Sequence, residues 1–179
     1  MIALHKQKTT QLFHTLKEGR FLSQNDPNRQ IQNLYRYVEQ NIDLLEEYFS
    51  YIGITIKLRD GYCYFASLEN KEQKLKTIYE LLDIFAFFLQ FDPNFNVGYR
   101  FSLDGIKKRI KDDITLKTQL EKIKDLNTQT LHAQVLSLVT KLQKRGFVAL
   151  ENEYEQQYIV LDSCRYLFKF FEKIEIKES

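Results

Sequence analysis

Apolar and polar residues follow two different spacings along this chain, and the spacings predict helices interrupted by two β-hairpins. Apolar residues at the helical spacing i, i+3, i+4 and i+7 are typical of an amphipathic helix with one buried face. The clearest example is the set Ile31, Leu34, Tyr35 and Val38. This pattern predicts helices over residues 9–18, from Asp26-Pro27 onward, 43–51, 70–91, from Ser102 onward, 115–124, 129–145 and 163–174. In the second of them Asp26 is expected to be the N-cap and Pro27 the first helical residue.

The two hairpins are predicted by alternation and by turn residues. Residues 54–58 alternate apolar and polar side chains, and residues 62–66 follow after Arg59-Asp60-Gly61. An Asp-Gly pair between two such segments favours a tight two-residue hairpin turn. Residues 147–151 and 157–161 form the second predicted hairpin, around Asn152-Glu153-Tyr154-Glu155.

The two halves of the chain share one order of elements: helix, short strand, helix, helix, hairpin. This order defines a winged helix, a helix-turn-helix with a two-stranded wing. Gly19-Arg20-Phe21 also returns loosely as Gly98-Tyr99-Arg100-Phe101. The predicted fold class is therefore mainly α with two small β-hairpin wings (α+β), arranged as tandem winged-helix domains over residues 1–69 and 70–179. Because Gly and Pro are scarce, we expect no flexible linker and two units packed as one rigid body.

Composition narrows the function classes. The chain has 26 basic and 24 acidic residues, a net charge of +2, so any basic surface must be a local patch. Cys63 and Cys164 are expected to be reduced, buried thiols of a cytosolic protein. The start of the chain is not typical of a secretory signal, and the longest apolar stretch, residues 81–91, is far shorter than the ~20 residues that span a bilayer. We therefore expect no membrane insertion.

Residues for enzyme chemistry are sparse. No two of the six glycines lie within two positions of each other, which excludes a P-loop and a dinucleotide-binding glycine turn. The chain has no Cys-x-x-Cys, and His5, His14 and His132 are not at metal-binding spacing. The sequence predicts no catalytic residue, no cofactor and no metal, and so a binding protein rather than an enzyme.

Two basic clusters are the candidate DNA-binding residues, as contacts to the phosphate backbone. They are Lys107, Lys108, Arg109 and Lys111 in one helix and Lys141, Lys144 and Arg145 at the end of another. The second cluster also has a structural interpretation, since cations at a helix C-terminus complement the helix dipole. The second wing carries Glu151, Glu153 and Glu155, which would repel a DNA backbone.

Several stretches, taken with this order of elements, resemble the MksE/MukE-type subunits of bacterial condensins. The resemblance extends over nearly the whole chain, and no single motif in it is diagnostic. The stretches cover residues 19–23, 45–53, 61–65, 92–93 with 98–101, 144–147, and 158–163 leading to Tyr166-Leu167.

The resemblance implies a role and not a reaction. Such subunits are dimeric, non-catalytic scaffolds that bind a kleisin, which bridges the heads of an SMC ATPase in an MksBEF/MukBEF-like complex. The resemblance implies a role in chromosome organisation or segregation, or in plasmid defence. It also implies a location in the cytoplasm, at the nucleoid, and is compatible with non-specific contact with DNA. It identifies no signature residue as a kleisin contact.

Two alternatives stay open at this point. The chain could be a winged-helix transcription regulator that reads one operator through residues 129–134, because recognition helices contact bases with their N-terminal turns. The wide apolar surfaces of the helices at 70–91 and 163–174 could be dimer or kleisin contacts, or could fill the core between the units.

Overall fold

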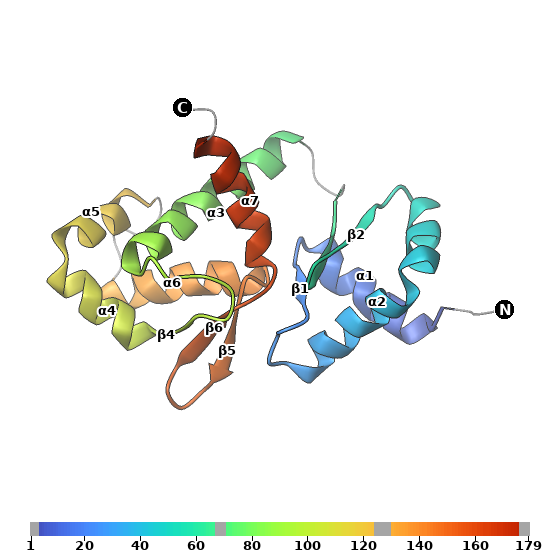
Figure 1. Ribbon diagram of the computed structural model, residues 1–179, viewed down its shortest axis with the longest axis horizontal. Helices are drawn as coiled ribbons and strands as arrows, with labels where there is room; N and C mark the ends of the chain where they lie inside the picture. Colours follow the sequence, from blue (N-terminus) through green and yellow to red (C-terminus); the bar gives the residue numbers. More distant parts are fainter. Residues whose placement is uncertain (1–3, 67–70, 124–129, 176–179) are drawn as a thin grey trace.

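The computed structural model describes residues 4–66, 71–123 and 130–175, with the side chains of 71–74 and 172–175 excepted. Figure 1 shows two lobes, the N-terminal half (residues 4–66) in blue to cyan and the C-terminal half (residues 71–175) in green to red. The N-terminal half contains α1 (Lys6–Lys17), β1 (Leu22–Ser23), α2 (Arg29–Ser50), β2 (Ile56–Arg59) and β3 (Tyr62–Phe65). The C-terminal half contains α3 (Lys71–Phe91), β4 (Arg100–Ser102), α4 (Leu103–Asp112), α5 (Ile114–Lys122), α6 (Leu131–Lys144), β5 (Val148–Asn152), β6 (Gln157–Val160) and α7 (Cys164–Glu175).

Each half contains one small antiparallel sheet, and the two sheets have the same internal order. The short strand that precedes the helices pairs with the second strand of the hairpin, which gives β1-β3-β2 and β4-β6-β5. The predicted fold class, mainly α with two small β-hairpins, is confirmed for the described residues. The identification of each half as a winged helix and the boundary near residue 70 stay predictions.

Both hairpins form where the turn residues predict them. In the first, Arg59 pairs with Tyr62 across the two-residue turn Asp60-Gly61, and Gly61 has the positive φ of 81° that such a turn needs. In the second, the Asn152 side chain accepts the Tyr154 N–H at 3.0 Å, and Gln156 takes the positive φ of 48°.

The helical segment α2 agrees with the two predicted helices and differs from the prediction at its N-cap. Its backbone leaves the helical conformation at Asn41 (φ −133°), so residues 29–50 are two helical stretches that meet at a kink, where the Asn41 side chain donates to the Tyr37 carbonyl at 2.9 Å. Asn28 and not Asp26 is the N-cap. The Asp26 carboxylate is buried and accepts the Asn28 N–H at 2.9 Å, so it ends up inside the fold before the helix begins.

The apolar residues form a separate core in each half. The core of the C-terminal half takes up most of the apolar surface of α3, including Ile84, Phe85 and Phe88, and Phe168 and Phe171 of α7 pack against it. Ile84, Phe85 and Phe88 are therefore buried in the core of the C-terminal half itself and not in a core between the units, while Leu75 and Tyr79 of α3 stay exposed. None of the helices in the described residues has the length and apolar character of a membrane span.

Candidate functional site between the two halves

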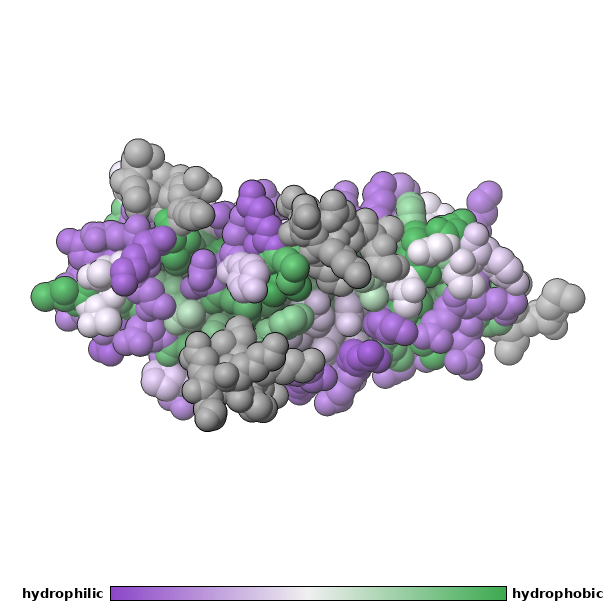
Figure 2. Space-filling view, turned by 90° about the horizontal axis from the view of Figure 1, so that it is seen from above, coloured by the Kyte–Doolittle hydropathy of each residue, from purple (hydrophilic) through white to green (hydrophobic). Residues whose placement is uncertain are grey.

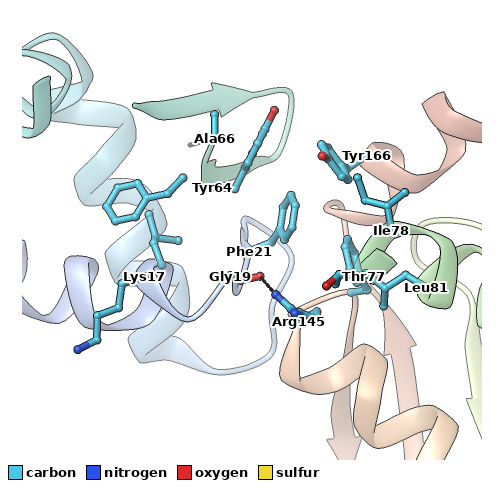
Figure 3. Close-up of a pocket in the computed structure, with 13 residues that line it drawn as sticks. Lys17, Gly19, Phe21, Tyr64, Ala66, Thr77, Ile78, Leu81, Arg145 and Tyr166 are labelled. Carbon is cyan, nitrogen blue, oxygen red and sulfur yellow. Dashed lines mark hydrogen bonds between the residues drawn. The ribbon is translucent and has the colours of Figure 1, made fainter. Parts of the chain in front are cut away.

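The two halves meet through a short segment of the N-terminal half, residues 19–25, which lies against the end of α6. The Phe21 N–H donates to the Arg145 carbonyl at 2.9 Å, and the Arg145 guanidinium donates to the Gly19 carbonyl at 3.4 Å. Figure 3 marks the second of these bonds. The end of α6 and the start of β1 are thus held together by the backbone of both partners.

Two further bonds join the same segment to the turn between β6 and α7. The Ser23 hydroxyl accepts the Ser163 N–H at 3.1 Å, and the Asn25 side-chain oxygen accepts the Asp162 N–H at 2.8 Å. Ser23 and Ser163 are both fully buried. Buried polar groups need partners, so a substitution that removes one of these side-chain acceptors while the halves stay packed would leave a buried N–H group unsatisfied.

The tip of the first hairpin also reaches the C-terminal half. One guanidinium nitrogen of Arg165 lies 2.9 Å from the Asp60 carbonyl and 2.8 Å from the Asp162 carboxylate. Burial raises the pKa of Asp162, and the nearby Arg165 partly offsets this shift. A Cβ added to Gly61 would lie 2.7 Å from Asp162, so this contact requires glycine at the turn.

Aromatic rings fill the space between these polar contacts. The Phe21 ring lies 4.9 Å, centroid to centroid, from each of the rings of Tyr64, Phe147 and Tyr166. Tyr64 and Tyr166 meet edge to face at 5.1 Å. Such pairs add about 0.5–1.5 kcal/mol each beyond the apolar area they bury.

A cavity of about 70 Å³ lies beside these rings, in a cleft between the halves. Figure 3 shows Phe21, Tyr64 and Tyr166 turned toward one another, with Ile78 and Leu81 of α3 on one side and Lys17 directed away. The volume is about half of a cavity that holds benzene, so it has room for part of one apolar side chain. The arrangement therefore suits recognition of a chain segment with an apolar side chain.

The side chains of the first basic cluster have different partners, although Lys107 and Lys111 are at the i, i+4 spacing that places two residues on one side of a helix. On α4, Lys107 pairs with Asp104 at 2.6 Å and lies 3.4 Å from His132 of α6, whereas Arg109 pairs with Asp113 at 3.6 Å. Successive residues of a helix point about 100° apart, so neighbours in sequence separate on its surface.

The remaining predicted DNA contacts divide between solvent and the junction. Lys108 borders a hollow beside the α3–β4 connection, and Lys111 borders another between α5 and α6. Lys141 and Lys144 lie in the last turn of α6. Arg145 lies at the cleft, where it contacts the N-terminal half. No observation tests contact of any of these residues with DNA, so these assignments stay predictions.

Residues proposed for operator reading have local roles where they are described. Gln129 lies outside the described residues. Thr130 is the N-cap of α6 and accepts the Ala133 N–H at 3.3 Å, and His132 is exposed next to Lys107. In the second hairpin, Glu151 accepts two hydrogen bonds from the Arg100 guanidinium, at 2.6 and 2.8 Å.

The structure also shows where the residues considered for metal and thiol chemistry lie. In the part of the chain that the structure describes, no three His, Cys, Asp or Glu side chains lie close enough to hold a metal ion. Cys63 and Cys164 are fully buried, and burial raises the pKa of both thiols.

The family model of the condensin complex protein MksE matches residues 7–172, a span that includes both halves and the junction. The chain belongs to this family. A comparison with curated proteins gave no significant match. As a member of the MksE family the chain is a subunit of a condensin complex. Some of the stretches that carried the sequence resemblance, 19–23, 61–65, 144–147 and Tyr166, contribute residues to the cleft. Phe21, Tyr64 and Tyr166 lie in or directly beside those stretches, but no sequence pattern indicated that they would contact one another.

Proposed function

We propose that this chain is the non-catalytic, kleisin-binding subunit of an MksBEF-like SMC complex, and that it acts as a homodimer. In this proposal each half is a winged helix used for docking to proteins rather than for reading DNA. The MksE family match is the observation that carries the proposal. ATP hydrolysis would belong to the SMC partner, in agreement with the lack of a P-loop sequence in this chain.

The cleft between the halves is the best candidate for the kleisin contact. It combines an apolar wall at Phe21, Ile78 and Leu81 with one cation, Arg145, at its border. A segment with one apolar anchor and nearby acidic side chains would match both features, because buried anchors give affinity and rim charges give orientation. The bonds across the junction keep the two walls in place, which lowers the ordering cost of binding.

Co-purification from the native host tests the function. We expect the tagged full chain to bring down a long coiled-coil ATPase and a kleisin-like protein. A purified chain that binds one short DNA duplex tightly, and brings down no such partners, would instead indicate a transcription regulator.

A matched pair of substitutions tests the cleft. Ala66 borders the cleft and Ala86 borders a separate groove between α3 and α5, and both are partly exposed. Ala66→Arg should abolish capture of the kleisin, whereas Ala86→Arg should leave capture unchanged, with circular dichroism as the check on folding. If Ala66→Arg captures the kleisin normally, the cleft assignment is wrong while the function stands.

A further inference from the structure

The end of α2 presents a concentrated exposed apolar patch in the N-terminal half. Tyr48, Tyr51 and Ile52 are 50, 79 and 59% exposed and follow each other at i, i+3 and i+4, so they share one side of the helix end. Figure 2, viewed from above, shows green apolar surface over the N-terminal half at the right. Exposed large apolar side chains that cluster in this way mark interaction sites.

The patch has a fixed shape. The Gly53 and Ile54 N–H groups donate to the Ser50 and Phe49 carbonyls at 3.0 Å each and close the helix end. The Tyr51 hydroxyl donates to the Glu47 carboxylate at 3.0 Å. An aromatic side chain held in one orientation loses little entropy on binding.

A groove lies directly beside this patch. It has a volume of about 400 Å³ and runs between α1 and the end of α2. Its apolar lining comes from Leu4 and Phe13 on one side and from Tyr48, Phe49 and Ile52 on the other. An aromatic ring fits easily, since a 150 Å³ cavity already holds benzene.

The charged residues near the patch are basic on the α1 side and acidic on the α2 side. On one side, Lys6 lines the groove, Lys8 is two residues further along the same helix, and α1 contains no acidic residue. The last fourteen residues of α2, 37–50, carry only acidic charges, at Glu39, Asp43, Glu46 and Glu47. A basic side and an acidic side around one apolar centre complement themselves after a two-fold rotation.

The C-terminal half supports the same inference by comparison. Gly53 and Gly146 hold equivalent places, each between a long helix and the first strand of a hairpin, with φ of 73° and 75°. At Gly146 the segment around Phe21 covers the helix end, with the Phe21 carbonyl 2.4 Å from the place of an added Cβ. At Gly53 no described atom lies within 4 Å of that place. The helix end at Gly146 in the C-terminal half is thus covered by the segment around Phe21, whereas the equivalent helix end at Gly53 in the N-terminal half is open among the described residues.

We propose that the end of α2 is the face through which two copies of this chain pair, with Tyr51 of each copy in the α1–α2 groove of the other. The acidic end of α2 then lies against the basic α1 of the second copy, twice in the dimer. This inference rests on the homodimer of the proposed function and names its surface.

Sedimentation of the full chain over a concentration series is the first test. Wild type should show a monomer–dimer equilibrium, and Tyr51→Arg should raise the dimer Kd at least about thirty-fold, as for removal of a central aromatic anchor. Tyr154→Arg is the matched control, because Tyr154 is a fully exposed tyrosine at the tip of the other hairpin. An unchanged Kd for Tyr51→Arg would show that the dimer uses another face.

Charge reversal is the second test. One variant carries Lys6→Glu with Lys8→Glu. The other carries Glu46→Lys and keeps Glu47, so that the bond from Tyr51 to Glu47 is retained. Each exchange places a charge that the dipole of its helix favours, which supports folding. Each variant alone should be monomeric, and an equal mixture should form heterodimers. A mixture that stays monomeric contradicts the pairing of α1 with α2. A wild type that is monomeric at every soluble concentration would overturn both the homodimer and this face, without affecting the kleisin result from co-purification.

Discussion

Gly146 offers a direct measure of how tightly the two halves are joined. It lies at the end of α6 with a φ of 75°, and a Cβ at this position would be 2.4 Å from the Phe21 carbonyl oxygen and 3.3 Å from the Arg20 side chain. Gly146→Ala therefore has two costs. The left-handed backbone costs an alanine about 1–2 kcal/mol. Overpacking against a neighbouring backbone adds about 1–3 kcal/mol.

Gly53→Ala separates these two costs. Gly53 has a φ of 73°, the same kind of helix end, and open space where the Cβ would lie. It should therefore be destabilised by the backbone term alone, about 1–2 kcal/mol. The smaller entropy of the unfolded chain is common to both variants and cancels in the comparison. The difference between them, about 1–3 kcal/mol, reports the packing at the junction alone.

Thermal and urea unfolding followed by circular dichroism measure this difference. A chain of this size loses about 2–4 °C of Tm per kcal/mol, so Gly146→Ala should melt roughly 2–12 °C below Gly53→Ala. Hydrogen exchange provides a local readout, because the Phe21 amide is bonded to the Arg145 carbonyl across the junction. That amide should exchange faster in Gly146→Ala and not in Gly53→Ala. Equal melting points and equal Phe21 exchange would refute the assignment of Gly146 as a close neighbour of the Phe21 backbone.

Three further outcomes are expected. Burial raises the pKa of Asp26, so in the pH range above its ordinary value of 3.8 the free energy of unfolding should fall as pH rises. In urea titrations Asp26→Asn should flatten this slope and stabilise the protein at neutral pH. An unchanged slope would contradict the assignment of the slope to Asp26. Cys63 and Cys164 should resist alkylation in the native state, because both thiols are buried. The two cysteines lie in different halves, so mass spectrometry of the labelled protein at rising urea concentration should show which half unfolds first. Rapid labelling of the native protein would contradict their burial. Alanine at Lys107, Lys108 and Arg109 should weaken DNA binding equally for all DNA sequences. The slope of the logarithm of the binding constant against the logarithm of the salt concentration should fall in magnitude by about 0.9 for each DNA phosphate that the variant no longer neutralises. An unchanged slope would remove these residues from the DNA-binding assignment.

The sequence predicted those parts of the fold that depend on near neighbours. The Asp60-Gly61 turn places its hairpin because two adjacent residues determine the turn geometry. Asp26 was wrongly predicted as a helix cap because the signal is local, whereas its burial depends on the tertiary packing around it. The two helices predicted in this region were correct, because the backbone is non-helical at Asn41, between them, where the Asn side chain bonds to the preceding turn.

The candidate site was beyond such reasoning because it joins residues that are distant in the chain. Gly19 and Arg145 are 126 positions apart, and Ser23 and Ser163 are 140 apart. Periodicity shows that Phe21 and Tyr166 have apolar rings, but it contains no information on which rings meet.

Arg145 shows how the junction alters the interpretation of a basic residue. It was predicted to contact DNA with Lys141 and Lys144, yet its carbonyl accepts the Phe21 N–H and its guanidinium donates to the Gly19 carbonyl. A substitution of Arg145 would change its bond to Gly19 and any DNA contact together, so weaker DNA binding in that variant would not identify its cause. Lys107, Lys108 and Arg109 make no such bond to the N-terminal half among the described residues, and their salt slope therefore isolates the charge effect. DNA contact by this subunit is best judged on α4, and the end of α6 is best judged by stability and hydrogen exchange.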